Sequence, residues 1–157
     1  MKVGRITCSD RASAGIYEDG SGPEIERVFA GIWPGPAEFV AKIIPDEVRE
    51  IEAALRHLSD EIGCPLIITT GGTGFAARDV TPEATRAVIE KELPGFGEIM
   101  RSVSFAVAPT SILSRATAGT RGRSLIINLP GNPKAIAQCL PPLVPAIREA
   151  LRHLDES

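Results

Sequence analysis

Short runs of β-favouring residues alternate along this chain with stretches in which apolar residues recur at helical spacing. The β-rich runs are Val3–Cys8, Phe39–Ile44, Pro65–Thr70 and Ser124–Leu129. Strands that alternate with helices favour an α/β fold, because a parallel strand can follow another only after a crossover connection. The sequence therefore predicts a three-layer α/β/α sandwich with a mostly parallel sheet. A length of 157 residues suits a single domain over 1–157.

Several start signals mark the expected helices. We predict helices from Pro23, after Asp46, from Thr81, near Pro94, from Pro133 and over Leu143–Leu154. Asp46, Thr81 and Asn132 stand where an N-cap is expected, because their short polar side chains can accept hydrogen bonds from the free N–H groups of a first turn. The segment from Thr117 to Gly122 is polar and rich in glycine, which indicates a turn or a mobile loop.

Composition excludes several classes of partner. The net charge is −3 with both signs mixed along the chain, and aromatic residues are only 4%, so neither a nucleic acid nor a membrane surface is expected as a partner. Cys8, Cys64 and Cys139 are far apart in the sequence, which argues against a disulfide framework or a zinc site. Buried, reduced thiols in a cytoplasmic protein are the expectation. The N-terminus does not resemble a signal peptide.

Polar or glycine-rich segments follow all four predicted strands. They are Ser9-Asp10-Arg11, Asp46, the segment from Gly71 to Asp79, and the segment from Asn128 to Lys134. Open parallel sheets bind ligands at the carboxyl ends of their strands. We therefore expect these segments to converge on one edge of the sheet, where a binding site would lie.

The segment Gly71-Gly72-Thr73-Gly74 is the strongest local signal for anion binding. Glycines allow backbone N–H groups to approach a phosphate closely. The segment is not a Walker A loop, because no Gly-Lys-Ser/Thr follows it. Gly72-x-Gly74-x-x-Ala77 matches the dinucleotide fingerprint only weakly, since the next helix begins as late as Thr81. A phosphate loop and a flexible turn after a buried strand both remain open from these residues alone.

Asp46 and Asp79 are the candidate catalytic carboxylates. A carboxylate beside a nucleotide can hold Mg²⁺, which prefers oxygen ligands, or can help to position a nucleophile. The alternatives are a helix cap for Asp46 and a solvated turn residue for Asp79. Lys134 follows a Pro-Gly-Asn-Pro turn and could reach a phosphate, although an ordinary surface lysine fits equally well. The histidines have no partner at metal-ligand spacing.

An ordered set of motifs carries a family resemblance over most of the chain, from about Val3 to Ile136. The motifs are Ser9-Asp10-Arg11-Ala12-Ser13, Ile44-Pro45-Asp46-Glu47, Thr69-Thr70-Gly71-Gly72-Thr73-Gly74, Arg78-Asp79-Val80-Thr81-Pro82-Glu83, Pro94-Gly95-Phe96, Ser114-Arg115 and Asn128-Leu129-Pro130-Gly131-Asn132-Pro133-Lys134. Together they resemble the molybdopterin adenylyltransferases, which include the bacterial Mog and MoaB proteins and the G domain of gephyrin. Each motif is weakly specific alone, whereas the ordered set is highly specific.

The resemblance implies a role in molybdenum cofactor biosynthesis: Mg²⁺-dependent transfer of AMP from ATP to the phosphate of molybdopterin, with release of pyrophosphate. It implies that Asp46 and Asp79 are the catalytic and metal-binding residues. The substrate-binding residues it implies are Ser9, Asp10, Arg11, Gly71, Gly72, Thr73, Gly74, Pro130, Gly131, Asn132 and Lys134. It also implies a homotrimer, with a downstream molybdenum-insertion protein as a partner.

Two alternatives come from other classes of function. The chain lacks the longer C-terminal extension of some Mog proteins and in this respect overlaps with MoaB proteins. A non-catalytic pterin-binding or scaffolding module of the same fold is therefore the alternative reading, although the presence of both Asp46 and Asp79 argues against it. The second alternative is an unrelated dinucleotide-binding α/β protein, and the late helix start at Thr81 argues against it.

Overall fold

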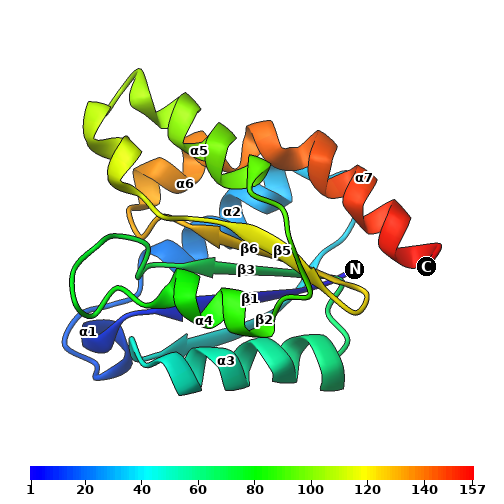
Figure 1. The fold of residues 1–157 in the computed structure, drawn as a ribbon, viewed down its shortest axis with the longest axis horizontal. Helices are drawn as coiled ribbons and strands as arrows, with labels where there is room; N and C mark the ends of the chain where they lie inside the picture. The colour runs from blue at the N-terminus through cyan, green and yellow to red at the C-terminus, as the bar shows by residue number, and fades with distance from the viewer.

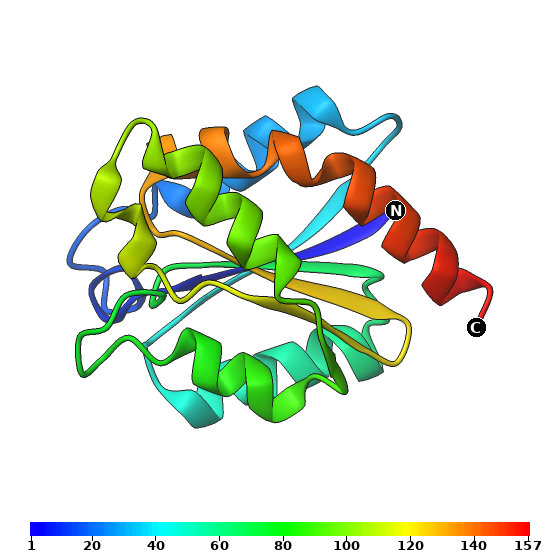
Figure 2. The ribbon, with the colours of Figure 1, turned by 45° about the horizontal axis from the view of Figure 1, so that its top comes forward.

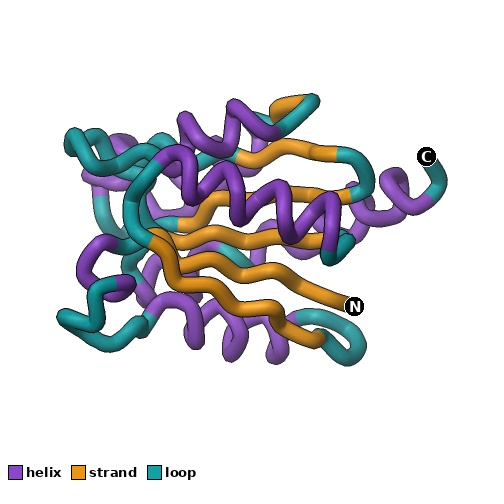
Figure 3. The backbone as a smooth tube through the Cα atoms, turned by 90° about the horizontal axis from the view of Figure 1, so that it is seen from below, coloured by secondary structure: helices purple, strands orange, loops and turns teal.

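Four neighbouring parallel strands form most of the sheet in the computed structural model, which describes residues 1–157. The six-stranded sheet has the order β2-β1-β3-β6-β5-β4. The strands are β1 (Lys2–Cys8), β2 (Glu38–Ile44), β3 (Leu66–Thr70), β4 (Lys91–Glu92), β5 (Ala118–Arg121) and β6 (Ser124–Leu129). β5 and β4 add antiparallel pairs at one edge. Figure 3 shows the strands of the sheet side by side.

Helices cover both faces of this sheet. They are α1 (Asp10–Ser13), α2 (Ser21–Ile32), α3 (Val48–Arg56), α4 (Thr81–Val88), α5 (Gly95–Phe105), α6 (Pro133–Cys139) and α7 (Val144–Asp155). The π-helical turn η1 (His57–Glu61) continues α3, and the 3₁₀ turns η2 (Pro109–Leu113) and η3 (Pro141–Leu143) follow α5 and α6. Helices α3 and α4 lie on one face, and α2, α5, α6 and α7 lie on the other (Figures 1 and 2). The predicted three-layer α/β/α fold is confirmed.

Strand alternation divides the core into two parts. Ile67 on β3 and Ile126 on β6 pack with residues of α3 and α4 in one cluster. Their neighbours Leu66, Ile68 and Ile127 point to the opposite face and pack with α2, α5, α6 and α7. Every residue of β3 and β6 is buried, which is typical of strands covered by helices on both faces. The central strands β3 and β6 are therefore fixed within the core, and the loops that leave their carboxyl ends start from fixed positions.

The loop expected from Thr117 to Gly122 is instead largely a strand. Residues 118–121 form β5, which pairs with β6 through the tight turn at Gly122 and also with β4. The sequence Ala-Gly-Thr-Arg lacks the β-branched or aromatic content that marks most strands. Pairing with the well-defined strand β6 supplies the order that local propensity does not.

Two of the three predicted helix caps are wrong. Asn132 does cap α6, because its side-chain oxygen accepts a hydrogen bond from Lys134 N. The residue before α3 is Glu47, and the Asp46 carboxylate accepts a hydrogen bond from Asp10 N instead. Thr81 is already helical and donates its hydroxyl to Gly71 O. Both side chains thus connect loops at the edge of the sheet rather than cap the N-terminus of a helix.

The three cysteines are free and buried, as expected for Cys8, Cys64 and Cys139. Burial raises the pKa of the Cys8 thiol to about 12, so this thiol stays protonated and unreactive at neutral pH. Among the helices of the chain, none has the length and apolar content that crossing a membrane requires.

Candidate active site

The loops that leave the parallel strands meet at one edge of the sheet. Ser9 N donates to Ile44 O at 2.9 Å, which joins the ends of β1 and β2. The hydroxyl of Thr70 donates to Pro130 O at 2.7 Å, which joins the ends of β3 and β6. The expected convergence therefore occurs, and it follows directly from the parallel register of these strands.

Gly71 and Gly72 of the glycine loop after β3 are packed closely against neighbouring segments, so a side chain at either position would force a shift. Gly71 and Gly72 have φ values of +92° and +65°, which side chains disfavour. A Cβ on Gly71 would lie 2.3 Å from Cys8 O, and one on Gly72 would lie 2.3 Å from the Thr81 hydroxyl. Thr81 also holds both loop carbonyls, donating its hydroxyl to Gly71 O at 2.9 Å and its N–H to Gly72 O at 3.2 Å. The loop is thus a fixed structure and not a flexible turn.

Asp10 and Asp46 hold each other in place. Asp10 N donates to Asp46 Oδ2 at 2.9 Å, and Asp46 N donates to Asp10 Oδ1 at 3.0 Å. Arg78 donates to both Asp10 carboxylate oxygens at 3.0 Å and to Glu47 Oε1 at 2.8 Å. The Arg78 guanidinium and the Asp46 N–H hold the pKa of Asp10 below its usual range. The Asp10 carboxylate is therefore fully engaged in orienting the loops.

The Asp46 carboxylate has one oxygen that makes no hydrogen bond within the protein. This atom, Oδ1, is buried and faces Gly72, where an added Cβ would approach it to 3.1 Å. Burial raises the pKa of Asp46, the Asp10 N–H offsets part of that rise, and the charges of Asp10 and Asp79 add to it. A buried acceptor without a donor, close to other carboxylates, suits a cation.

These carboxylates fit a magnesium ion. The chain places no three acidic, histidine or cysteine side chains together as a complete metal cage. Mg²⁺ commonly takes one or two carboxylates from the protein and completes its shell with water and substrate phosphates. Asp46 and Asp79 could provide that pair, because they lie on either side of the glycine loop and are near enough for the charge of Asp79 to raise the pKa of Asp46.

Asp79 ends the exposed segment, residues 75–78, that follows the glycine loop. Its Oδ2 accepts a hydrogen bond from Ala76 N at 2.9 Å, and its own N–H donates to Ala76 O at 3.0 Å. Gly74 lies directly against this carboxylate, since an added Cβ would be 2.7 Å from Oδ2. The side chain is half-buried and borders a cavity beside the glycine loop. It is therefore placed to act on a ligand there.

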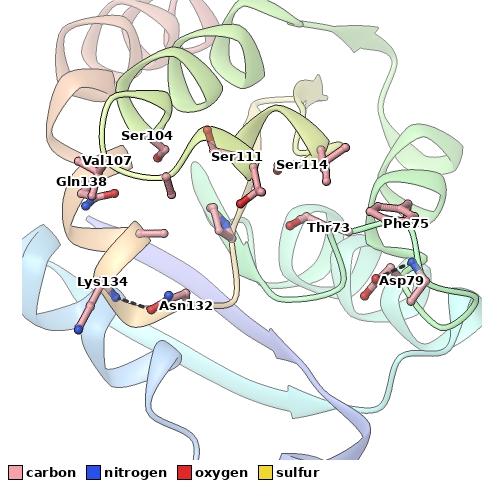
Figure 4. A pocket seen from close by; sticks show the side chains of 17 residues that line it. Thr73, Phe75, Asp79, Ser104, Val107, Ser111, Ser114, Asn132, Lys134 and Gln138 are labelled. Carbon is pink, nitrogen blue, oxygen red and sulfur yellow. Dashed lines mark hydrogen bonds between the residues drawn. The ribbon is translucent and has the colours of Figure 1, made fainter.

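A cavity of about 600 Å³ opens beside the glycine loop. One wall comes from the loop after β3 and carries Thr73, Phe75 and Asp79, and the facing wall comes from the start of α6 and carries Asn132 and Lys134 (Figure 4). The remaining lining comes from α5 and η2. The volume suits a small organic ligand, and the opposed Asp79 and Lys134 give it a carboxylate and an ammonium group.

The structure divides the sequence-predicted site residues into two groups. Those that line the cavity are Thr73, Gly74, Asp79, Pro130, Asn132 and Lys134. Those that lie beside it, along the same edge of the sheet, are Ser9, Asp10, Arg11, Asp46, Gly71, Gly72 and Gly131. Ser9 caps α1 by accepting from Ala12 N, and Arg11 lies over the ring of Tyr17 at 5.0 Å. Neither of these side chains reaches the cavity.

Part of the cavity wall was not predicted from the sequence. The polar residues from α5, η2 and α6 are Ser104, Thr110, Ser111, Ser114 and Gln138. They do not follow a strand, and isolated serines carry no distinctive pattern. Ser114 belongs to the motif Ser114-Arg115, but that motif gave it no role in the site. Phe75 at the cavity mouth is 72% exposed, which is unusual for a phenylalanine and is visible only in the structure.

The fold and this edge of the sheet define an α/β protein with a cavity of small-ligand size at the carboxyl ends of its strands. Residues 4–149 match the family described as "Probable molybdopterin binding domain". The chain belongs to this family.

Individual relatives agree with that assignment. The chain is 54% identical to the molybdopterin adenylyltransferase of Helicobacter pylori over 94% of its own length and 84% of the relative. It is 48% identical to the Escherichia coli molybdopterin adenylyltransferase over 89% of its length and 72% of the relative. Among solved structures, the molybdopterin biosynthesis enzyme MoaB of Thermus thermophilus matches with a TM-score of 0.90 and 43% identity, over 99% of this chain and 97% of that one.

Proposed function

We propose that this chain is a molybdopterin adenylyltransferase, which transfers AMP from ATP to the phosphate of molybdopterin in an Mg²⁺-dependent reaction. The observation that carries the proposal is the pair Asp46 and Asp79 beside a rigid glycine loop. One oxygen of that pair, Asp46 Oδ1, is buried without a donor and is available to a cation. The family and the names of the relatives support the choice of molybdopterin as the acceptor.

The chemistry brings two anions together. A phosphate oxygen of molybdopterin attacks the α-phosphorus of ATP, the bond from that phosphorus to the β-bridging oxygen breaks, and pyrophosphate leaves. When bound, Mg²⁺ would be held by Asp46 and Asp79 and would neutralise phosphate charge. The protein's own task is to fix the phosphates in line and to balance their charge.

The residues around the cavity suit that task. The backbone of the Gly71–Gly74 loop would receive phosphate groups, because its glycines leave the backbone accessible. Lys134, at the first turn of α6, would neutralise a phosphate on the facing wall. The cavity also has room for one planar ring system, either the adenine of ATP or the pterin of molybdopterin. Its serine and threonine hydroxyls would hydrogen bond to the ring nitrogens and oxygens.

The decisive experiment measures pyrophosphate release from ATP with purified protein, Mg²⁺ and molybdopterin. We expect release that depends on all three components and one adenylylated molybdopterin for each pyrophosphate. Binding of molybdopterin without pyrophosphate release would instead support the non-catalytic pterin-binding module. Binding of neither substrate would contradict both functions.

Acidification should inactivate the enzyme at a pH above the usual range for an aspartate. The folded-state pKa of Asp46 is raised, so protonation removes its charge earlier as the pH falls. Arg78 opposes this rise, and Arg78→Gln should therefore move the acid limb of the pH–rate profile to still higher pH. The profile of each protein at Mg²⁺ concentrations well below saturation checks this, because the Asp46 carboxylate then titrates without a bound cation. An unchanged acid limb in Arg78→Gln would show that another group sets it.

We also propose that the chain assembles as a homotrimer, on the family resemblance, and that it works in the cytoplasm, where its three free thiols stay reduced. Light scattering across micromolar concentrations measures the assembly directly, and a monomer mass throughout would contradict the trimer. Magnesium and ATP are tested by the same transfer assay, with each omitted in turn.

A further inference from the structure

Arg115 makes an unusual set of bonds to the loop that carries the proposed catalytic residues. It lies between η2 and β5, outside the cavity lining, and its side chain is 36% exposed. Its Nε donates to Gly74 O at 2.7 Å and its Nη2 donates to Asp79 O at 2.8 Å. Its backbone N–H donates to Thr73 O at 2.8 Å. One residue thus contacts both ends of the segment from Thr73 to Asp79.

Other contacts fix the neighbourhood of that segment, since Thr81 N donates to Gly72 O and Arg78 donates to Asp10 and Glu47, but none of them joins Gly74 to Asp79. Residues 75–78 between the ends are exposed and belong to no helix or strand. Within the segment, Asp79 and Ala76 exchange two hydrogen bonds, but these close only a local turn. The Arg115 guanidinium bonds to both ends of the segment and so links Gly74, the last residue of the glycine loop, to Asp79.

Arg115 is itself anchored on both sides. Its Nη1 donates to Glu83 Oε2 on α4 at 2.6 Å. Two residues later, Thr117 O accepts from Asn128 N of β6 at 2.9 Å, which fixes this part of the chain to the sheet. A planar guanidinium can donate to three separated acceptors at once, whereas a lysine ammonium is a compact point charge on a flexible stem. The position therefore calls for arginine.

We propose that Arg115 is the positioning residue of this site: it holds the Thr73–Asp79 loop closed and so aims the Asp79 carboxylate, without itself touching substrate. This inference rests on the proposed adenylyl transfer. A displacement of about 1 Å in a group that positions reactants can cost on the order of 100-fold in rate. Loss of the guanidinium should have an effect of that size through Asp79.

The variant Arg115→Ala tests the inference, with Arg86→Ala as the matched control. Arg86 also reaches Glu83, at 4.0 Å, but bonds to neither Gly74 nor Asp79. We expect Arg115→Ala to lower kcat on the order of 100-fold, Arg115→Lys to recover little of it, and millimolar guanidinium to recover part of it in Arg115→Ala alone. Arg86→Ala should stay within about threefold of the wild type. If Arg115→Ala keeps the wild-type kcat, the inference is wrong.

Two further readouts separate positioning from the other roles of an arginine. Amide hydrogen exchange over residues 73–80 should accelerate in Arg115→Ala and stay unchanged in Arg86→Ala, with no activity required. In an Asp79→Asn background, Arg115→Ala should change the residual rate by less than about threefold, because both changes disable the same group. A full additive loss there, or a raised KM for ATP with unchanged kcat, would assign Arg115 to substrate binding and overturn the inference.

The controls also keep this inference apart from the proposed function. If the wild-type protein releases no pyrophosphate, the proposed transfer fails, and loop exchange still reports whether Arg115 closes the segment. If the wild type is active and Arg115→Ala matches it, only the role of Arg115 fails. Should Arg115→Ala prove unfolded, Glu83→Gln removes only the outer anchor of the guanidinium, and the same acceleration of loop exchange, smaller in size, is expected. Normal exchange in that variant would contradict the inference.

Discussion

Asp46→Asn should reduce adenylyl transfer about 100-fold or more while leaving the protein folded. The asparagine keeps an oxygen that can accept from Asp10 N, so the link between the β1 and β2 loops is retained. It removes the negative charge next to the buried Oδ1 position, where we place the cation. Loss of one electrostatic group commonly costs a factor of about 10²–10³ in kcat. Steady-state pyrophosphate release at saturating Mg²⁺ measures the loss.

The same substitution should leave stability at neutral pH unchanged or raise it. Burial raises the folded-state pKa of Asp46, so the ionised form is favoured less in the folded protein than in the unfolded chain. This loss of stability develops as the pH rises through the unfolded and then the folded pKa. A neutral asparagine does not incur it, and functional sites often carry residues that lower stability in this way.

Asp60→Asn is the matched control, because this substitution should lower the stability of the protein, whereas Asp46→Asn should not. Asp60 lies on η1, outside the cavity lining, where hydrogen bonds from Arg121 lower its pKa. Asp60→Asn should therefore keep full activity and lose a little stability at neutral pH. If Asp46→Asn retains near-normal transfer, the Asp46 carboxylate is structural, and the catalytic assignment is wrong. Asp79→Asn tests the second carboxylate in the same assay, since it keeps an acceptor for Ala76 N.

Much of the framework of this site could be predicted from the sequence, because each of the four parallel strands coincides with a β-rich run. Their parallel register places Ser9, Asp46, Gly71 and Gly131 at one edge, whatever the details of the helices. Polar residues at strand ends are also easy to recognise locally. The position of the site therefore follows from topology alone.

The cap predictions failed because Asp46 and Thr81 have partners that are distant in the sequence. A short polar residue before a helical pattern is locally indistinguishable from an N-cap, yet Asp46 pairs with Asp10 and Thr81 with Gly71. Both partners lie at the ends of other strands. Local rules take no account of such competition, which is most frequent at the edge of the sheet where the loops crowd together.

The far wall of the cavity could not be predicted for a different reason. Ser104, Ser111 and Gln138 come from helices, and only the packing of α5 and α6 brings them beside the glycine loop. The strand β5 was missed similarly, because its four residues gain their order from β6. In both cases the determining contacts are tertiary. Arg115 belongs with them, since its acceptors at Gly74 and Asp79 are 41 and 36 residues away.

Gly71→Ala should destabilise the protein far more than Gly63→Ala, although both glycines have positive φ. At Gly63 an added Cβ meets nothing within 4 Å, so only the backbone conformation opposes it, at about 1–2 kcal/mol. At Gly71 the Cβ would lie 2.3 Å from Cys8 O, a backbone atom at the end of a central strand. Relieving such overpacking typically costs a further 1–3 kcal/mol or so.

Urea unfolding of the two variants measures the difference directly, because the backbone term is common to both. Domains of ordinary stability, about 5–15 kcal/mol, should survive either change, so activity can be measured on folded protein. Gly71→Ala must move the glycine loop away from β1 to fit its methyl group, and the loop carries the backbone that we propose binds phosphate and faces Asp46. We therefore expect transfer to fall at least tenfold in Gly71→Ala and to stay normal in Gly63→Ala. Equal unfolding midpoints would show that the loop can shift freely, and would remove the rigid phosphate loop on which the proposed chemistry depends.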